Sequence, residues 1–409
     1  MKKLPPENIH IHLPGYSMVL ALCFLTFLLS CSHSRGQDDI LTGAERTDMY
    51  MPMLGGKRVG IVANQTSVIG STHLVDSLIS IGGGEDMIRK VFSPEHGFRG
   101  EAEAGSIIED NVDPGTGLPV ISLYGSNRKP SPEALADLDA IVFDLQDVGA
   151  RFYTYISTLF YVMQACAENG KQMIILDRPN PNGFYVDGPV LDTTYRSFVG
   201  MHEVPVVHGM TIGEYGQMIN GEGWLGNGLV CNLEVIPCLN YDHALHYKVP
   251  VSPSPNLPNM NAIYLYPSTC FFEGTVISEG RGTDFPFEVF GHPRLENAYF
   301  AFTPESIPGK SEHPKLKGET CMGMDLRYLR NNPRREGRIN LSWLLFAYEN
   351  FPEKEKFFIP YFENLAGTAH LRQQIMDGMT EDEIRSSWSD QLAAFRKIRK
   401  KYLLYPDFE

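Results

Sequence analysis

The feature that most constrains this chain is a regular alternation of short apolar runs and helical patterns between residues 57 and 176. The apolar runs are rich in β-branched residues, whereas apolar residues recur at helical spacing between them, as at Leu74, Leu78 and Ile81. Strands that are apolar along their whole length are covered on both faces, which is typical of parallel sheets. We therefore expect an α/β fold with a Rossmann-like, doubly wound parallel sheet. The predicted strands are 57–63, 88–92, 119–123, 140–143 and 173–176, and the predicted helices are 73–80 and 156–168.

The sequence changes character after residue 220. Glycines cluster there, and a proline-rich stretch at 250–258 excludes both a helix and a central strand. A strand is expected at 233–236 and one long helix at 381–402, so this part mixes both kinds of element. We predict that it is a second domain, of the α+β class. The predicted organisation is a signal peptide at 1–30, a polar tether at 31–46, the sheet domain at 47–220 and the α+β domain at 221–409.

The first thirty residues are predicted to direct export. Lys2 and Lys3 precede an apolar run at 18–30, which is too short to span a bilayer and has the length of a signal-peptide core. Cys31 follows in the sequence LLSC, which resembles the bacterial lipobox, where the cysteine thiol is acylated. We expect an exported protein that an acylated Cys31 anchors to a membrane, in the periplasm or at the outer membrane. The alternative is a plain secretory signal with an incidental cysteine.

Charge and glycine spacing exclude several classes of partner. The formal net charge is −14, which disfavours nucleic acid because phosphates require a positive surface. No G-x-G-x-x-G follows the first predicted strand, and G-x-x-x-x-G-K-[ST] occurs nowhere, so a nucleotide phosphate site is not predicted. We expect no cofactor, no metal and no nucleic-acid partner.

Polar residues follow every predicted strand of the sheet. Ligands of open parallel sheets bind beyond the carboxyl ends of the strands, so we expect these residues to converge on one site. Chance polarity in loops would explain one or two such strand ends but not all of them. The candidates are Asn64 and Gln65 after the first strand, Glu95 and His96 after the second, Tyr124 after the third, Asp144, Gln146, Asp147, Arg151 and Tyr153 after the fourth, and Arg178 and Asn180 after the fifth.

Glu95 is the strongest catalytic candidate. It lies between Pro94 and a glycine-containing turn, and a partly desolvated crevice would raise its pKa and suit it to protonate a leaving oxygen. The alternative is a glutamate that only caps a turn. Glycoside hydrolysis usually needs two carboxylates. The available partners are Asp144, Asp147, Glu214 and Glu279, and Asp144 and Asp147 are the predicted catalytic ones. A 2-acetamido sugar can also supply its own nucleophile, in which case the second carboxylate only orients that group.

Two arginines predict recognition of an anionic ligand. Arg151 is followed by aromatic residues, and Arg281 lies between glycines, where a backbone can approach a ligand closely. Arginine pairs a carboxylate through two parallel hydrogen bonds, although an internal salt bridge is the alternative for either residue. Thr211 and Glu214 have the spacing of a capping box, so Glu214 is expected to be structural. The further substrate-binding candidates are His208 and Glu279.

Six longer motifs carry a family resemblance. In their order along the chain they resemble the NamZ-type family of exo-β-N-acetylmuramidases. The likeness runs from about Asp48 to the segment 402–406, which is nearly all of the chain beyond the predicted signal peptide. The motifs are SPEHGFRG at 93–100, DLQDVGARFYTY at 144–155, DRPNP at 177–181, HGMTIGE at 208–214, SPSPNLP at 252–258 and EGRGTDFPFE at 279–288.

The resemblance implies release of N-acetylmuramic acid from the non-reducing end of peptidoglycan fragments. It also implies a Rossmann-like N-terminal domain, a smaller C-terminal domain and an active site in the cleft between them. The glutamate of the family's SPEHG motif corresponds to Glu95. Muramic acid carries a lactyl carboxylate that glucosamine lacks, and we expect Arg151 or Arg281 to bind it.

Two other functions are alternatives. The first is a metal-dependent hydrolase, although no H-E-x-x-H or comparable spacing supports it. Its candidate ligands are Glu95, His96, Asp144, Asp147 and His208. The second is a surface lipoprotein that binds cell-wall sugars without cleaving them.

Overall fold

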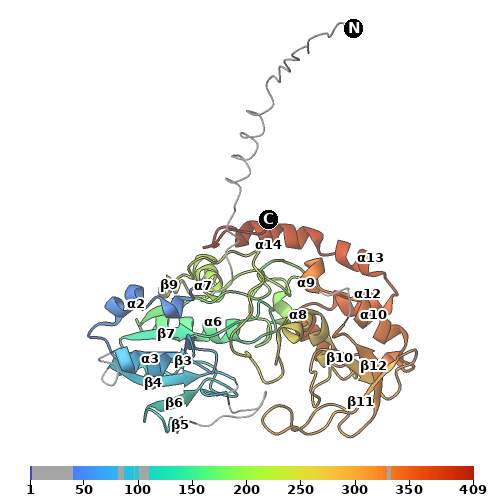
Figure 1. Ribbon diagram of the computed structural model, residues 1–409, viewed down its shortest axis with the longest axis horizontal. Helices are drawn as coiled ribbons and strands as arrows, with labels where there is room; N and C mark the ends of the chain where they lie inside the picture. The colour runs from blue at the N-terminus through green and yellow to red at the C-terminus, as the bar shows by residue number, and fades with distance from the viewer. Residues whose placement is uncertain (2–39, 82–86, 96, 101–109, 329–332) are drawn as a thin grey trace. The chain divides into compact units, whose positions relative to one another are not determined.

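A seven-stranded sheet organises the N-terminal part of the computed structural model (Figure 1). The first strand along the chain, β1, lies in the middle of the sheet. The next parallel strands, β4 and β6, lie on one side of β1, and the later strands β7, β8 and β9 lie on its other side. These six strands are parallel, and β5 pairs antiparallel with β6 at the edge. The order is β5 (Asn111–Val112), β6 (Pro119–Ser122), β4 (Ile88–Ser93), β1 (Val59–Ala63), β7 (Ala140–Asp144), β8 (Gln172–Leu176) and β9 (Asn232–Ile236). This is the doubly wound order, so the predicted Rossmann-like fold is confirmed.

The structure describes Met1 and residues 40–409 except 82–86, 96, 101–109 and 329–332. Residues 40–409 form one unit by their internal contacts. The predicted signal peptide and Cys31 lie outside the described residues. The sheet continues past the boundary expected at residue 220, because β9 pairs with β8. Among the described residues, no helix is both long and apolar enough to cross a membrane.

Different helices cover the two faces of the sheet, because successive side chains of a strand point to opposite faces. In β1, Ile61 packs in a cluster with α2 (Thr47–Leu54) and α3 (Leu74–Ile81). The next residue, Val62, belongs to a second cluster with α6 (Tyr155–Glu168) and α7 (Ile212–Gly221). Both faces are therefore buried, which explains why the strands are apolar along their length.

The structure confirms the helices and the helix ends predicted for the sheet domain. The helices expected at 73–80 and 156–168 are α3 and α6, and α6 ends before Gly170, which has a φ of +63°. The capping box of Thr211 and Glu214 begins α7. The remaining short elements here are η2 (Gly43–Glu45), β2 (Val68–Ile69), β3 (Thr72–His73), α5 (Pro132–Leu135) and η3 (Thr193–Tyr195).

The C-terminal part combines helices with a small antiparallel sheet in the order β10-β12-β11. The proline-rich stretch and α8 connect it to the sheet. Helices beside a small antiparallel sheet are the α+β architecture predicted for this part. Its elements are α8 (Met260–Thr269), η4 (Cys270–Gly274), β10 (Val289–His292), β11 (Phe300–Phe302), β12 (Cys321–Asp325), α9 (Pro333–Glu336), α10 (Ser342–Glu349), η5 (Lys354–Lys356), α11 (Phe362–Ala366) and α12 (His370–Met376).

The single helix predicted at 381–402 is wrong in one respect. The segment forms two helices, α13 (Glu381–Ser386) and α14 (Ser389–Arg399). Serine hydroxyls at the junction donate to backbone carbonyls, from Ser387 to Ile384 at 2.6 Å and from Ser389 to Ser386 at 3.0 Å. Such bonds compete with the regular helical pattern.

Candidate active site

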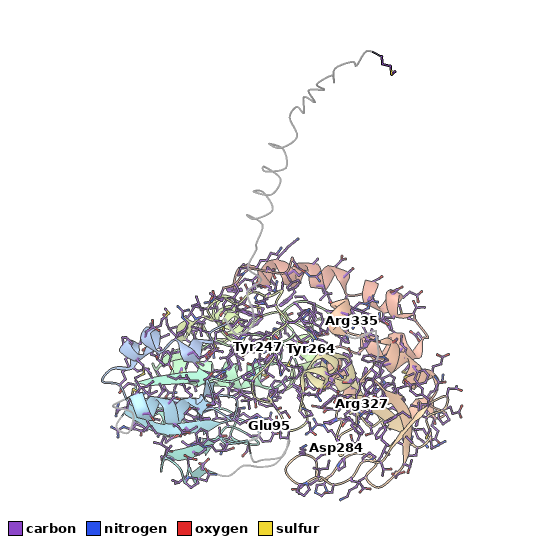
Figure 2. The ribbon with its side chains drawn as sticks, viewed as in Figure 1. Glu95, Tyr247, Tyr264, Asp284, Arg327 and Arg335 are labelled. Atoms are coloured by element: carbon purple, nitrogen blue, oxygen red, sulfur yellow. The ribbon has the colours of Figure 1, made fainter. Side chains whose placement is uncertain are left out.

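Residues that follow β4, β6 and β7 border a cavity of about 360 Å³. The C-terminal part supplies its opposite wall, and in Figure 2 Glu95 lies between the sheet and the C-terminal strands. A smaller cavity of about 60 Å³ shares Glu95, Thr154 and Arg281 with it. The polar side chains that line the larger cavity include Glu95, Tyr124, Arg128 and Thr154 on the sheet side and Glu273, Arg281 and Tyr361 opposite them.

Glu95 is placed in the cavity by the sheet itself. It follows Pro94 at the end of β4, where Ser93 still pairs with Ser122 of β6. The Oγ1 of Thr154 donates to Oε2 of Glu95 at 3.2 Å. Tyr124 also hydrogen-bonds Glu95, and burial together with this carboxylate raises the pKa of the Tyr124 hydroxyl. Glu95 is thus a half-buried carboxyl group held by two hydroxyl groups and open to a cavity.

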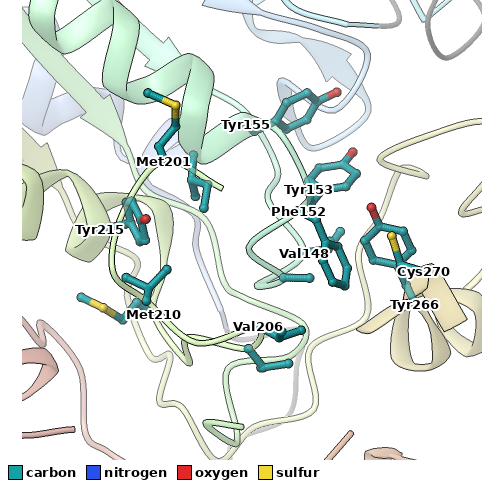
Figure 3. Close-up of a cluster of buried hydrophobic side chains, with 14 of the residues drawn as sticks. Val148, Phe152, Tyr153, Tyr155, Met201, Val206, Met210, Tyr215, Tyr266 and Cys270 are labelled. Atoms are coloured by element: carbon teal, nitrogen blue, oxygen red, sulfur yellow. The ribbon is translucent and has the colours of Figure 1, made fainter. Parts of the chain in front are cut away.

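Aromatic side chains line the smaller cavity together with Glu95. Figure 3 shows Phe152, Tyr153, Tyr155 and Tyr266 of this group. Tyr153 and Tyr155 lie side by side in the segment that enters α6, with ring centroids 4.8 Å apart. Phe152 packs edge-on against Tyr266 of α8 at 5.3 Å. The hydroxyl of Tyr153 donates to the carbonyl of Pro253 at 2.7 Å, which ties the proline-rich stretch to the sheet. The predicted binding residue Tyr153 therefore lines the smaller cavity and also braces it.

Glu273 is the second carboxylate of the larger cavity, and the sequence did not suggest it. Arg281 binds it through Nη2 at 2.7 Å and through Nε at 3.1 Å, both to Oε1. Burial lowers the pKa of Arg281, but Glu273 and Glu279 raise it more, so the guanidinium stays charged. Arg281 therefore lies in the cavity as predicted, but it has an internal carboxylate partner.

Glu279 lies behind this pair and does not line either cavity. It is 2% exposed, and its Oε2 lies 2.8 Å from Nζ of Lys315. Its Oε1 lies 3.5 Å from Nε of Arg281. Glu279 therefore contributes negative charge beside the guanidinium of Arg281 and helps to position it.

Asp144 and Arg178 are paired with each other in the interior. Both are nearly inaccessible, and Nη2 of Arg178 donates to Oδ2 of Asp144 at 2.8 Å. Arg178 also donates to the carbonyl of Val68 at 3.0 Å. The structure thus corrects the prediction of Asp144 as a catalytic carboxylate and Arg178 as a ligand, because neither lines either cavity.

Asp147 and His208 form a second buried pair, with Oδ2 and Nε2 3.9 Å apart. The Oδ2 of Asp147 also accepts from the backbone N–H of Gly149 at 2.6 Å. Burial raises the pKa of Asp147 to about 7 and lowers the pKa of His208 to about 3. Neither residue lines the cavity of Glu95, which corrects their predicted roles in catalysis and binding.

Arg151 is fully buried and is bound by backbone carbonyls. Its Nη1 donates to Pro189 and Val204 at 2.8 Å each, and its Nη2 donates to Leu365 at 2.9 Å and Ala366 at 2.7 Å. Burial lowers the pKa of Arg151 to about 9. Arg151 therefore joins distant backbone segments, and the prediction that it binds a ligand carboxylate is wrong.

The predicted amide residues hold the strand ends together. Asn64 donates to the hydroxyl of Tyr155 at 2.6 Å, and Asn180 donates to the carbonyl of Met210 at 2.8 Å. Gln146 donates to the carbonyls of Asp147 and Pro179, each at 2.8 Å, and Gln65 donates to the carbonyls of Ser252 and Pro253, each at 3.3 Å. These contacts are structural, and none of the four side chains lines the cavity.

The metal-dependent alternative can be examined only for the candidate ligands that the structure describes. His96 lies outside the described residues. Within the ranges that the structure describes, no three His, Cys, Asp or Glu side chains are grouped to hold a metal ion.

The sequence pattern missed most of the cavity wall. Tyr124 was expected only as a polar strand end, while Arg128, Glu273 and Tyr361 were not singled out. Arg128 lies six residues beyond β6, and Glu273 lies in η4, which no sequence motif marks. Only the position of Arg128 near the end of a predicted strand could have signalled it.

The largest of the cavities described, about 710 Å³, lies elsewhere. It is lined by residues 189–193 and by side chains of α12 and α14, with Trp388 and Phe395 among them. It contains none of the predicted site residues. Size therefore does not identify the site, whereas converging polar groups do.

Comparisons with known proteins match nearly the whole described unit. The family description "Exo-beta-N-acetylmuramidase NamZ, N-terminal" matches residues 59–261, and "Exo-beta-N-acetylmuramidase NamZ, C-terminal" matches residues 264–405. The chain is 38% identical over 374 residues to the peptidoglycan beta-N-acetylmuramidase NamZ of Bacillus subtilis (strain 168), which covers 87% of this chain and 89% of that protein.

Two solved structures from Bacteroides fragilis NCTC 9343 are also similar, both of DUF1343 family proteins. The first is 46% identical with a TM-score of 0.83, and the second is 28% identical with a TM-score of 0.75. Each similarity covers 90% of this chain and 99% of the other chain. The similarity therefore extends over both the sheet and the C-terminal part.

Proposed function

The chain belongs to the NamZ family of exo-β-N-acetylmuramidases, and on this premise we propose that it releases N-acetylmuramic acid from the non-reducing ends of peptidoglycan fragments. The observation that carries this proposal in the structure is Glu95 in a cavity of about 360 Å³ between the sheet and the C-terminal part. A cavity of this volume suits a terminal sugar. Glycosidases act through carboxyl groups placed beside the bond they cleave.

Glu95 is the general acid of this proposal. Its proton passes to the glycosidic oxygen as the bond between that oxygen and the anomeric carbon breaks, and water later returns a proton to Glu95. Thr154 and Tyr124 keep the carboxyl group in one orientation. The neighbouring aromatic side chains of Phe152, Tyr153 and Tyr155 line the smaller cavity on one side of it.

Glu273 is the second carboxylate of this proposal. Arg281 contacts only its Oε1 in the bonds described, at 2.7 and 3.1 Å. A carboxylate here serves either of two routes. It accepts the N–H of the 2-acetamido group when that group attacks the anomeric carbon, or it activates water when water attacks directly.

Hydrolysis of two chromogenic substrates tests this function. We expect the chain to cleave a β-N-acetylmuramide and to leave the matching β-N-acetylglucosaminide intact. Glu95→Gln should lower kcat by about 10²- to 10⁴-fold, because the amide cannot donate the proton, while the thermal midpoint and the affinity for N-acetylmuramic acid stay unchanged. Glu203→Gln, in the unrelated larger cavity, is the matched control.

Other results would favour the alternative functions. Binding of N-acetylmuramic acid by the unmodified chain without any turnover would support a sugar-binding lipoprotein. Loss of hydrolysis after chelation, restored by a divalent metal, would support a metal-dependent hydrolase.

We also propose that the chain is exported and lipid-anchored through Cys31. The support is the sequence alone: an apolar run of signal-peptide length that ends in LLSC. Mass spectrometry of the membrane fraction should find an acylated N-terminal cysteine, and Cys31→Ala should shift the protein to the soluble fraction. An unmodified Cys31 in an intact chain would contradict the anchor.

A further inference from the structure

The cavity that holds Glu95 contains two guanidinium groups with different surroundings. Arg281 is paired with Glu273 at 2.7 Å and lies 3.5 Å from Glu279. Arg128 forms no ion pair with any carboxylate among the described residues, and it is exposed at the cavity wall. The positive charge of Arg281 is therefore balanced within the protein, whereas that of Arg128 is available to a ligand.

Arg128 is nevertheless held in a defined position. Its guanidinium carbon lies 4.2 Å from the centroid of the Phe198 ring, and Phe198 lines the same cavity. Stacking on a ring occupies the flat face of a guanidinium and leaves its N–H edge free for a planar acceptor. The next residue, Lys129, is paired with Glu168 of α6 at 2.5 Å, which anchors the segment behind Arg128.

We propose that Arg128 binds the lactyl carboxylate of the terminal N-acetylmuramic acid and so determines the preference for this sugar. This proposal rests on the proposed function. A carboxylate is the planar, bidentate acceptor that the N–H edge of arginine fits. The role takes the place of the one expected for Arg151 or Arg281, since Arg151 is fully buried and Arg281 already has a partner.

Arg128 and Glu95 line the same cavity, as the binding of one sugar ring by both residues requires. The side chain of Tyr124, which hydrogen-bonds Glu95, also interacts electrostatically with Arg128 and Arg281. In N-acetylmuramic acid, the bond to be cleaved is at C1 and the lactyl ether is at C3 of the same ring. A residue that protonates the C1 oxygen and a cation that binds the C3 substituent must therefore face one cavity from separate positions, as Glu95 and Arg128 do.

A pair of substrates that differ only in charge tests the proposal. One is a chromogenic β-N-acetylmuramide with a free lactyl carboxylate, and the other is its neutral lactyl methyl ester. Arg128→Met should lower kcat/KM for the acid by about tenfold, mainly through KM, and should change the ester less than twofold, because only the acid loses a charged hydrogen bond. Arg128→Lys should restore part of the difference, since it keeps the charge but not the bidentate geometry.

Arg89→Met is the matched control, because Arg89 is exposed on β4 and does not line the cavity. An equal loss for acid and ester, or no loss for the acid, would overturn the proposal. If the unmodified chain cleaves neither substrate, the proposed function fails, and calorimetry still tests Arg128. The unmodified chain should then bind N-acetylmuramic acid more tightly than N-acetylglucosamine, and Arg128→Met should abolish that difference. Equal affinities in the unmodified chain would overturn the role of Arg128.

Discussion

Two groups of polar residues near the strand ends of the same sheet have opposite surroundings. The cavity group is Glu95, Tyr124, Arg128 and Thr154, and all four line the cavity. The buried group is Asp144, Asp147, Arg151, Arg178 and His208, and all five are nearly inaccessible. Except for His208, which lies shortly before α7, the members of both groups end or follow an apolar strand along the chain.

The comparison teaches that the contacts of a polar residue at a strand end decide its role. Asp144 and Arg178 satisfy each other, and Arg151 is bound by four backbone carbonyls. A buried polar group without a partner is costly, so such residues are paired inside the protein. The cavity group keeps hydrogen-bonding capacity at a surface that a ligand can reach. The buried group therefore builds the strand ends, and the cavity group is left for chemistry.

The largest expected effect comes from breaking the central pair of the buried group. Arg178→Met should lower the free energy of unfolding by about 3–5 kcal/mol, because it leaves the Asp144 carboxylate buried without its cation. Urea denaturation measures this change. The remaining folded enzyme should keep its kcat, because Arg178 does not line the cavity.

An exposed pair on the same sheet domain provides the matched control. Arg58 contacts Asp139 through two side-chain bonds of 2.9 and 3.0 Å, but both side chains are more than 40% exposed. Arg58→Met should lower the free energy of unfolding far less than Arg178→Met does, because solvent screens an exposed ion pair. Similar losses for Arg178→Met and Arg58→Met would contradict the distinction between buried and exposed pairs.

The second expected effect is a pH dependence of stability that comes from Asp147. Burial raises its pKa to about 7, so between pH 4 and 7 the folded state holds a proton that the unfolded state has released. Its contribution to stability should therefore fall as the pH rises through this range and level off above about pH 7. Asp147→Asn should flatten this decline, as urea denaturation at several pH values would measure.

Asp139→Asn is a control of opposite sign. Arg58 holds the pKa of Asp139 below its usual range, so the contribution of this carboxylate is complete above about pH 5. The difference between this variant and the unmodified chain should be constant from pH 5 to 8. An unchanged slope in Asp147→Asn would show that Asp147 is not protonated in the folded protein at pH 6.

The smallest expected effect is in the cavity group. Thr154→Val removes the hydroxyl that donates to Glu95 at 3.2 Å and keeps the shape of the side chain. We expect kcat/KM for the β-N-acetylmuramide to fall by about three- to tenfold, which is the usual net value of one hydrogen bond, with little loss of stability. Thr303→Val, at a half-buried threonine of the C-terminal part that does not line the cavity, is the control. A loss of stability without a loss of activity would place Thr154 in the buried group instead.

The strands and the two long helices of the sheet domain could be predicted because their patterns are local. Continuous apolar runs and the Thr211–Glu214 capping box depend only on residues close in the sequence. The break at Ser387–Trp388 could not be predicted, because the helical spacing of apolar residues continues across it while Trp388 is buried against the core. Strand order also needed the structure, since it depends on contacts between distant segments.

The candidate site was predicted in part. Glu95, Tyr153 and Arg281 were singled out from the sequence and do line the cavities, whereas the buried group was assigned to the same site and is not there. Glu273 could not be recognised, since nothing near it in the sequence distinguishes it from an ordinary surface charge. Arg128 had only its position near the end of a predicted strand to mark it.

The sequence by itself determined the α/β class, the placement of Glu95 at the end of a strand and the family to which the chain belongs. Only the tertiary structure decided which polar residues meet each other and which meet the cavity. The physical reason is that the cost of a buried charge depends on its partners, and those partners come from segments far apart in the chain. Folding brings Arg151 to the carbonyls of Leu365 and Ala366, more than 200 residues away along the chain. It also brings Glu95 and Arg281 to the same cavity.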